Sequence, residues 1–175
     1  VADTPDARRY RQVIEECFNR VVFENDLKWP YWDRKNVPPA IDWLRARGIS
    51  IRGHCLVWPS WKNTPDDLLG LKSRPDELRK RVADHITEIV STYRGKLVDW
   101  DVINEIRTNR DLLDVLGDDV AADWFRLARA ADPDVRLRQQ ILPDARRCEG
   151  HGWADLAKVL TDGSDVLGAT HRSSV

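Results

Sequence analysis

Residues 97–105 read LVDWDVINE, a short apolar run that ends directly in an amide and a carboxylate, Asn104 and Glu105. A run of this length, rich in β-branched and aromatic residues, is typical of a buried strand. Residues 76–93, just before it, place their apolar side chains on one stripe and their charged side chains off it, which predicts a helix. The sequence therefore predicts a helix followed by a strand, and this pair is the repeating unit of the expected fold.

The same unit recurs along the chain. Thr4 and Pro5 begin a predicted helix that precedes a strand at 19–24, and a helix at 41–46 precedes a strand at 49–57. A helix at 119–131 is followed by a strand from about 135, a weaker helix at 153–160 and a possible strand at 166–169. Alternating helices and strands predict parallel βαβ units, in an open doubly wound sheet or in a closed barrel. Since no G-x-G-x-x-G or P-loop sequence follows a strand, a nucleotide-binding open sheet is disfavoured.

Chain length limits how much of a barrel can form. A complete (β/α)8 TIM barrel has about 250 residues, and this chain has 175. We expect an α/β fold that is an incomplete TIM barrel of roughly the first five or six units, within a single domain over residues 1–175.

Composition narrows the classes of partner. The 28 Lys and Arg nearly balance the 29 Asp and Glu, so we expect binding neither to nucleic acid nor to a membrane, and no obligate protein partner is inferred. Eight Trp residues suit a neutral sugar ligand, although core packing accounts for about half of such residues. The three widely spaced cysteines favour neither a disulfide framework nor a zinc site, and no metal or cofactor is predicted. The sequence shows no membrane-spanning run and no signal peptide.

Polar side chains gather where three predicted strands end. Each group alone has an ordinary explanation as solvated loop residues or core, but working residues of βα folds lie at the carboxyl ends of strands. Together these groups can bind sugar hydroxyls and provide a carboxyl group that protonates a leaving oxygen. The candidate residues are Glu24, Asn25, Lys28, His54, Trp58, Asn104 and Glu105.

Segments 18–29, 51–58 and 100–105 resemble the successive strand-end motifs of glycoside hydrolase family 10, the endo-1,4-β-xylanases. The resemblance covers residues 5–137. It implies retaining hydrolysis of internal β-1,4 bonds in a xylan-like polysaccharide, with Glu105 as general acid/base and Asn104 bonded to the 2-hydroxyl of the reacting sugar. It also implies that Glu24, Asn25 and Lys28 bind the neighbouring sugar on the non-reducing side. By the same resemblance, His54 and Trp58 line the cleavage site, no cofactor is needed, and the protein is secreted or attached to the cell surface.

The chain departs from the family pattern in three places. Pro59 and Trp61 stand where a His and a Gln are usual, and the strand from about 135 lacks an Asn-Asp-Tyr type ending. No Thr-Glu-Leu-Asp type segment, which would carry the nucleophile, occurs between 139 and 175. We therefore interpret residues 138–175 as a divergent tail that is truncated, misassembled or frame-shifted.

Two other readings of the chain stay open at this stage. A catalytically inactive, carbohydrate-binding barrel remnant is the main alternative to an enzyme. An open-sheet hydrolase or oxidoreductase has less support, because no nucleophile elbow or dinucleotide loop is present. Asp99 and Asp101 are interpreted as structural residues rather than as substitutes for the nucleophile.

Overall fold

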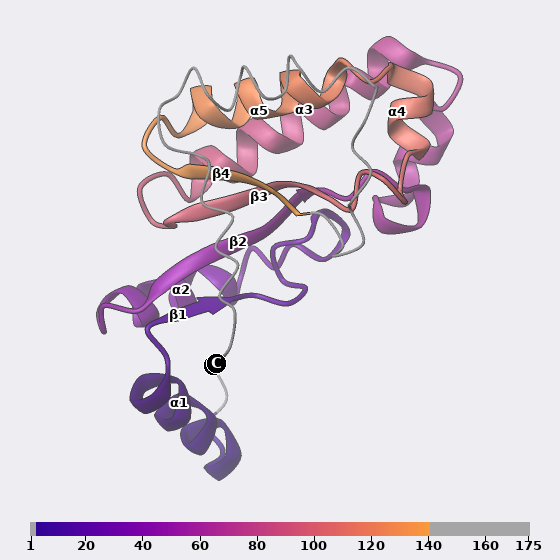
Figure 1. Ribbon diagram of the computed structural model, residues 1–175. Coiled ribbons are helices and arrows are strands. Elements are labelled where there is room, and N and C mark those ends of the chain that lie inside the picture. The colour runs from indigo at the N-terminus through magenta and orange to yellow at the C-terminus, as the bar shows by residue number, and fades with distance from the viewer. Residues whose placement is uncertain (1–2, 141–175) are drawn as a thin grey trace, which may run out of the picture.

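The computed structural model describes residues 3–140, which form four strands and five α-helices joined by short 3-10 helices (Figure 1). The strands are β1 (Arg20–Val22), β2 (Ser50–Val57), β3 (Asp99–Asn104) and β4 (Arg136–Gln140). The α-helices are α1 (Pro5–Cys17), α2 (Val37–Arg45), α3 (Pro75–Thr92), α4 (Asp111–Leu116) and α5 (Val120–Ala131). The 3-10 helices are η1 (Trp29–Tyr31), η2 (Trp61–Asn63) and η3 (Asp66–Leu71).

The four strands form one parallel sheet in the order β1-β2-β3-β4, which is also their order in the sequence. Crossover connections between parallel strands are right-handed. When each new strand is added on the same side of the previous one, the connecting helices therefore all lie on the same face of the sheet. An open doubly wound sheet instead reverses its direction of strand addition. The sequential order is therefore that of a partial β/α barrel, which confirms the predicted fold class.

The helix-covered face of the sheet holds the core. Helix α3 packs on β2, and α5 packs on β3 and β4 (Figure 1). Trp100 of β3 lies fully buried on this face, and its ring covers Gly53 of β2 so closely that a Cβ there would lie 2.1 Å from Trp100 Cε3. The glycine that the sequence places before His54 thus makes room for an indole of the core.

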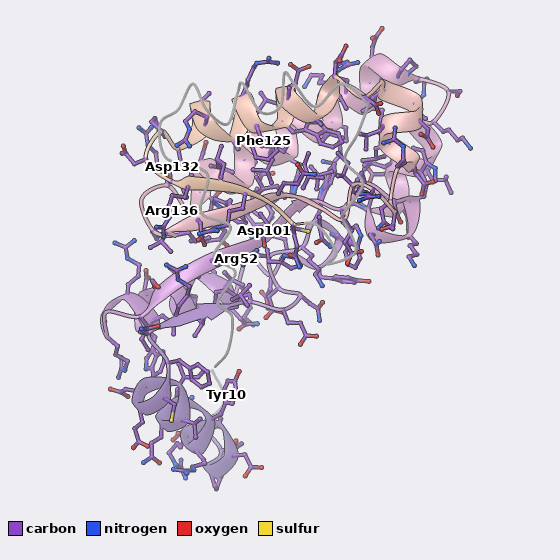
Figure 2. All side chains as sticks on the ribbon, in the orientation of Figure 1. Tyr10, Arg52, Asp101, Phe125, Asp132 and Arg136 are labelled. Carbon is purple, nitrogen blue, oxygen red and sulfur yellow. The ribbon has the colours of Figure 1, made fainter. Side chains whose placement is uncertain are left out.

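The long helices have the ends that the sequence predicts. Thr4 caps α1 by accepting a hydrogen bond from the Ala7 N–H at 3.2 Å, and α3 starts with Pro75 and two acidic residues in its first turn. Helix α1 differs from the others because none of its residues is buried, and Tyr10 is among the most exposed large apolar side chains (Figure 2).

Several predicted boundaries differ from the structure. The strand predicted at 19–24 is shorter, Arg20–Val22, because pairing with β2 covers three residues only. Helix α2 begins at Val37 rather than near Ile41, and takes both prolines into its first turn, where backbone N–H groups have no helical partner. Helix α4 and the three 3-10 helices were not predicted. The helix predicted at 153–160 and the strand predicted at 166–169 lie outside the described residues.

Candidate active site at the carboxyl ends of the strands

The candidate site lies at the edge of the sheet where β1, β2 and β3 end. Because the strands are parallel, their carboxyl ends meet at one edge, and every predicted site residue except His54 follows or terminates one of these strands. Glu24, Asn25 and Lys28 follow β1, Asn104 ends β3, and Glu105 directly follows β3. His54 lies within β2 and Trp58 just beyond it.

Lys28 connects the residues that follow β1 with Trp58, which lies just beyond β2. Its Nζ donates a hydrogen bond to Asn25 Oδ1 at 3.0 Å and lies over the ring of Trp58, 5.2 Å from the centroid. A cation at this distance from an indole face is attracted by the ring quadrupole. The lysine therefore holds the segment after β1 against the end of β2, and its remaining donors are available to a ligand. Glu24 is exposed and makes no hydrogen bond with the described residues.

His54 is oriented by a buried ion pair. Asp101, which has no exposed surface, accepts hydrogen bonds from Arg52 Nε at 2.9 Å and Arg52 Nη2 at 2.5 Å. The Asp101 carboxylate also lies 2.8 Å from His54 Nδ1. Since an ion-paired carboxylate accepts hydrogen bonds, Nδ1 carries the proton in neutral His54 and Nε2 remains an acceptor. Figure 2 labels Arg52 and Asp101 on the sheet, close to each other.

Asp99 lies two residues before Asp101 on β3, on the same face of the sheet, and is also fully buried. Arg138 Nε donates to its Oδ2 at 2.9 Å, and Arg20 and Arg136 lie 3.5 and 3.9 Å from the same oxygen. These contacts agree with the interpretation of Asp99 and Asp101 as structural residues, since guanidinium groups engage both carboxylates.

Glu105 occupies a sharp turn directly after β3. Its backbone has a φ of +54°, a conformation that non-glycine residues adopt rarely and mostly where the surrounding structure holds them. The Glu105 N–H donates to the Gln140 carbonyl at 2.9 Å, and the Glu105 carbonyl accepts from the N–H groups of Thr108 and Asn109. The turn ends the strand at Asn104, so Glu105 no longer follows the alternation of side chains along β3.

Asn109 is a site residue that the sequence reasoning missed. Its Nδ2 donates to Glu105 Oε2 at 3.2 Å, so the amide contacts the carboxyl group expected to act as acid/base. An amide four residues beyond a strand-ending acid is the signal that could have indicated it. Asn104 is buried beside Glu105, and within the described residues its Oδ1 has no hydrogen-bond partner.

Cys55 of β2 is a buried thiol close to charged side chains of the candidate site. Burial raises the pKa of its thiol to about 12, the nearby Asp101 and Glu105 carboxylates add to the increase, and the Lys28 ammonium opposes it. The Cys55 thiol on β2 is therefore influenced by the charge of Lys28, after β1, and by the charges of Asp101 and Glu105, in and after β3. Lys28 lies against Trp58 at the end of β2, and Glu105 directly follows β3 at the same edge of the sheet, whereas His54 lies inside β2, level with Asp101.

The unusual residues Pro59 and Trp61 are held by α4. The Trp61 N–H donates to Asp111 Oδ2 at 2.8 Å, and the Pro59 carbonyl accepts from the Leu112 N–H at 3.3 Å. The departure from the family pattern thus coincides with a helix that the sequence did not predict.

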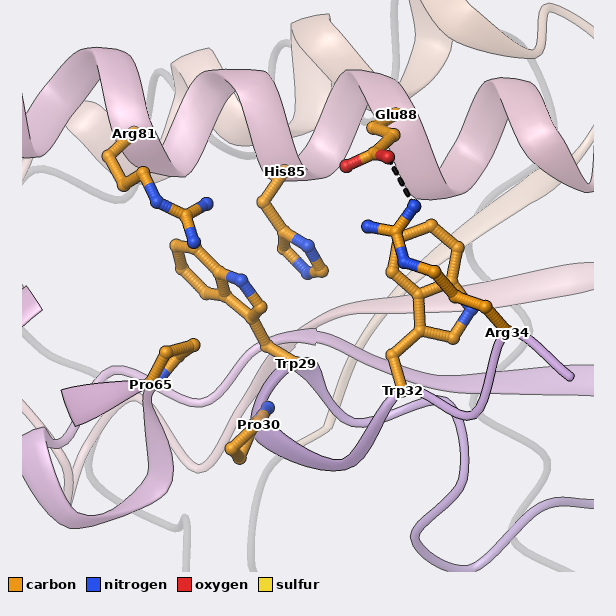
Figure 3. A pocket seen from close by; sticks show the side chains of 8 residues that line it. All are labelled: Trp29, Pro30, Trp32, Arg34, Pro65, Arg81, His85 and Glu88. Carbon is orange, nitrogen blue, oxygen red and sulfur yellow. Dashed lines mark hydrogen bonds and ion pairs between the residues drawn. The ribbon is translucent and has the colours of Figure 1, made fainter. Parts of the chain in front are cut away.

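A cavity of about 210 Å³ lies elsewhere, between η1 and α3 (Figure 3). Trp29 stacks on the buried His85 with ring centroids 4.1 Å apart, and Arg34 lies over the Trp32 ring and pairs with Glu88. None of the predicted site residues lines this cavity. Its indole faces are covered by protein groups, so we interpret it as part of the packing between η1 and α3.

Within residues 3–140, no group of three or more His, Cys, Asp or Glu residues is arranged to hold a metal ion. No helix in this part of the chain is long and apolar enough to cross a membrane.

Comparison with known proteins identifies the family. The sequence model of glycosyl hydrolase family 10 matches residues 2–139. The chain belongs to glycosyl hydrolase family 10. Among its relatives is a beta-1,4-xylanase of Dictyoglomus thermophilum, 31% identical over 147 residues that cover 73% of this chain and 40% of the relative.

Solved structures of the family share the fold of this chain. Native xylanase 10B from Thermotoga maritima is 30% identical with a TM-score of 0.69, over 78% of this chain and 46% of that one. Xylanase 10B from Thermotoga petrophila, in complex with xylobiose, is 30% identical with a TM-score of 0.68, over 77% and 45%. The chain thus spans less than half the length of these relatives, and its four strands correspond to a part of their barrel.

Proposed function

We propose that this chain supplies the acid/base carboxylate and the non-reducing-side sugar contacts of a retaining endo-1,4-β-xylanase. The observation that carries the proposal is the position of Glu105. It directly follows β3 at the edge where Lys28 and Trp58 also lie, and its carboxyl group is held by the amide of Asn109. The names of its relatives favour xylan as the substrate, and one related structure contains xylobiose.

In the proposed reaction Glu105 first acts as an acid. Its carboxyl group donates a proton to the glycosidic oxygen as that oxygen leaves the anomeric carbon, where a second carboxylate, which the described residues do not supply, forms a bond. The Glu105 carboxylate then takes a proton from the water that attacks the anomeric carbon and displaces the second carboxylate. Asn104 donates to the 2-hydroxyl of the reacting sugar, a contact that strengthens in the oxocarbenium-like transition state. Because Asn104 is buried, its amide is held in place before substrate arrives.

The other candidate residues position the sugar next to the reacting one. The Lys28 ammonium has donors beyond its bond to Asn25, and the Asn25 and Glu24 side chains are exposed after β1. His54 offers Nε2 as an acceptor for a hydroxyl, since Asp101 engages Nδ1. Trp58 adds an apolar ring for the C–H groups of a pyranose.

A second candidate function is sugar binding without turnover. Retaining hydrolysis needs a second carboxylate about 5–5.5 Å from the acid/base. The two other carboxylates of β3, Asp99 and Asp101, are engaged by guanidinium groups and are unsuited to attack an anomeric carbon. Together with the absence of a Thr-Glu-Leu-Asp type segment from the sequence, this favours a chain that binds xylo-oligosaccharides but does not cleave them.

One experiment separates the two functions. The purified chain is assayed for release of reducing ends from xylan and, in parallel, for xylotetraose binding by calorimetry. Glu105→Gln removes the titratable carboxyl group, and Glu77→Gln serves as the matched control because Glu77 lies exposed in the first turn of α3. Turnover that Glu105→Gln abolishes and Glu77→Gln retains supports the enzyme. Binding without turnover supports the second function, and loss of both refutes the proposed site.

The expected place of action follows from the substrate. Polymeric xylan does not cross membranes, so we propose that the protein works outside the cell or on its surface. Detection of the protein in the culture medium or on intact cells, rather than in the cytoplasmic fraction, tests this.

A further inference from the structure

His85 of α3 is a buried polar residue behind the candidate site. Only 2% of its surface is exposed, and α3 packs on β2 from the helix-covered face of the sheet. A ligand at the carboxyl edge of the sheet would therefore not touch the imidazole. Any effect of His85 on such a ligand has to act through the residues that the imidazole contacts.

The first contact of the imidazole is with η1. Trp29 stacks on it with ring centroids 4.1 Å apart and an interplanar angle of 2°, and Trp32 meets it edge-on at 6.1 Å. The Trp29 indole lies between this imidazole and the guanidinium group of Arg81 (Figure 3). Trp29 directly follows Lys28, whose carbonyl accepts a hydrogen bond from the Tyr31 N–H at 2.9 Å. The stack therefore fixes the short helix from whose start the Lys28 side chain extends.

The second contact is with β2, two residues before Trp58. His85 Nε2 donates to the Leu56 carbonyl at 3.1 Å, because a carbonyl oxygen only accepts. The register between β2 and β3 shifts at this point, since two residues of β2 lie between its pairs at 54 and 57, whereas one residue of β3 lies between 101 and 103. An extra residue disrupts the ladder locally and bends the strand. The hydrogen bond from α3 thus holds the chain at the irregularity that precedes Trp58.

Both contacts act on the same pair of candidate site residues. The Lys28 ammonium lies over the Trp58 ring, 5.2 Å from its centroid. We propose that His85 is a positioning residue that sets the Lys28 ammonium over the Trp58 ring, through Trp29 on one side and the Leu56 carbonyl on the other. Its consequence for sugar binding rests on the proposed function of Lys28 and Trp58, whereas the positioning itself requires no ligand.

The chemistry of the imidazole explains why a polar side chain occupies this part of the core. Burial lowers the pKa of His85 to about 3, so near neutral pH the ring is uncharged and Nε2 keeps its proton for Leu56. An apolar side chain would avoid the cost of burying a polar group, but it could not also donate to a carbonyl. Phenylalanine can make the stacking contact alone, and glutamine can make the hydrogen bond alone. These two residues therefore separate the contacts experimentally.

NMR of the chain labelled with 13C-lysine measures the positioning without a ligand. Protons above an indole face are shifted upfield by its ring current, so the Lys28 ε-methylene signal, assigned by its loss in Lys28→Met, should lie upfield of that of the exposed Lys80. His85→Leu keeps the bulk and removes both contacts, and it should move the Lys28 signal most of the way towards Lys80. His85→Phe and His85→Gln should give intermediate positions, because each keeps one contact.

Calorimetry with xylotetraose measures the consequence for binding. His85→Leu should weaken binding about tenfold, which corresponds to the loss of roughly one hydrogen bond from a charged group. His85→Phe and His85→Gln should each restore part of the affinity. Leu78→Ala is the matched control, because Leu78 is buried on α3 about two turns before His85. It should lower the free energy of unfolding and leave both the Lys28 signal and the affinity unchanged.

The outcomes separate this proposal from the proposed function. A Lys28 signal that stays in place in folded His85→Leu would overturn the positioning role, and so would an equal movement in Leu78→Ala. If the natural chain does not bind xylotetraose, the sugar-binding role of Lys28 fails, and the NMR comparison still decides the role of His85. If circular dichroism shows that His85→Leu does not fold, the other two variants decide, and an unmoved Lys28 signal in both would overturn the proposal.

Discussion

The contact between Gly53 and Trp100 predicts the effect of adding one methyl group. In Gly53→Ala the new Cβ would lie 2.1 Å from Cε3 and 2.4 Å from Cδ2 of the indole, where carbon atoms in contact are normally about 3.5–4.0 Å apart. The ring would have to move by about 1.5 Å. Trp100 is fully buried, so this movement displaces neighbouring core side chains. Overpacking costs about 1–3 kcal/mol, and we expect the upper part of this range, about 2–3 kcal/mol.

Urea unfolding of the purified chain measures this loss. Gly70→Ala is the matched control, because a Cβ at Gly70 meets no atom within 4 Å. Its free energy of unfolding should change by about 0.5 kcal/mol or less, or rise slightly as the unfolded chain loses freedom. Equal unfolding midpoints for the two variants would refute the argument from the indole contact.

A double-mutant cycle attributes the loss to its cause. In a Trp100→Leu background the ring is absent, so Gly53→Ala should cost at least about 1 kcal/mol less than in the natural chain. An identical cost in both backgrounds would mean that the strand backbone, rather than the indole, resists the methyl group.

Two further predictions concern buried titratable groups. Burial, opposed by a hydrogen bond to the Leu56 carbonyl, lowers the pKa of His85 from 6.5 to about 3. The folded state thus binds this proton less readily than the unfolded state. Stability should therefore fall as pH decreases from about 6.5 towards 3, by up to about 1.4 kcal/mol per pH unit from this residue. Urea unfolding between pH 4 and 7 should show a shallower slope for His85→Phe, which keeps a ring against Trp29, and parallel slopes would contradict this origin. The raised pKa and burial of Cys55 predict that iodoacetamide at pH 8 modifies the exposed Cys17 and spares Cys55 until urea unfolds the chain. Peptide mass mapping that finds both labelled equally fast in the folded protein would be inconsistent with the described core.

Long periodic elements could be predicted from sequence because their own side chains determine them. Helix α3 was expected at 76–93 and is observed at Pro75–Thr92, with its apolar stripe buried against the sheet and α5. Short elements depend on neighbours instead. Strand β1 is limited by the three residues that find partners on β2, and the six-residue α4 is too short for a helical period to stand out.

The location of the candidate site was also predictable, whereas its internal contacts were not. Parallel strands bring their carboxyl ends together whatever the register, so Lys28, Trp58 and Glu105 could be grouped from the strand pattern alone. The contact of Arg20 with Asp99 spans from β1 over β2 to β3 and depends on the register of three strands. The bond from Asn109 to Glu105 depends on a left-handed turn at a non-glycine residue, and the four-residue spacing of the two side chains does not by itself indicate that turn.

The two faces of this sheet should respond differently to heat. The helix-covered face is held by apolar contacts around Trp100, whose stabilising effect per unit area levels off on warming. The opposite face is held by ion pairs around Asp99 and Asp101, and the cost of removing charges from water falls as temperature rises. The share of the stability that comes from the ion-paired face therefore grows with temperature. Near the melting point, ion pairs on the face opposite the helices contribute more to holding the strands together than they do at room temperature.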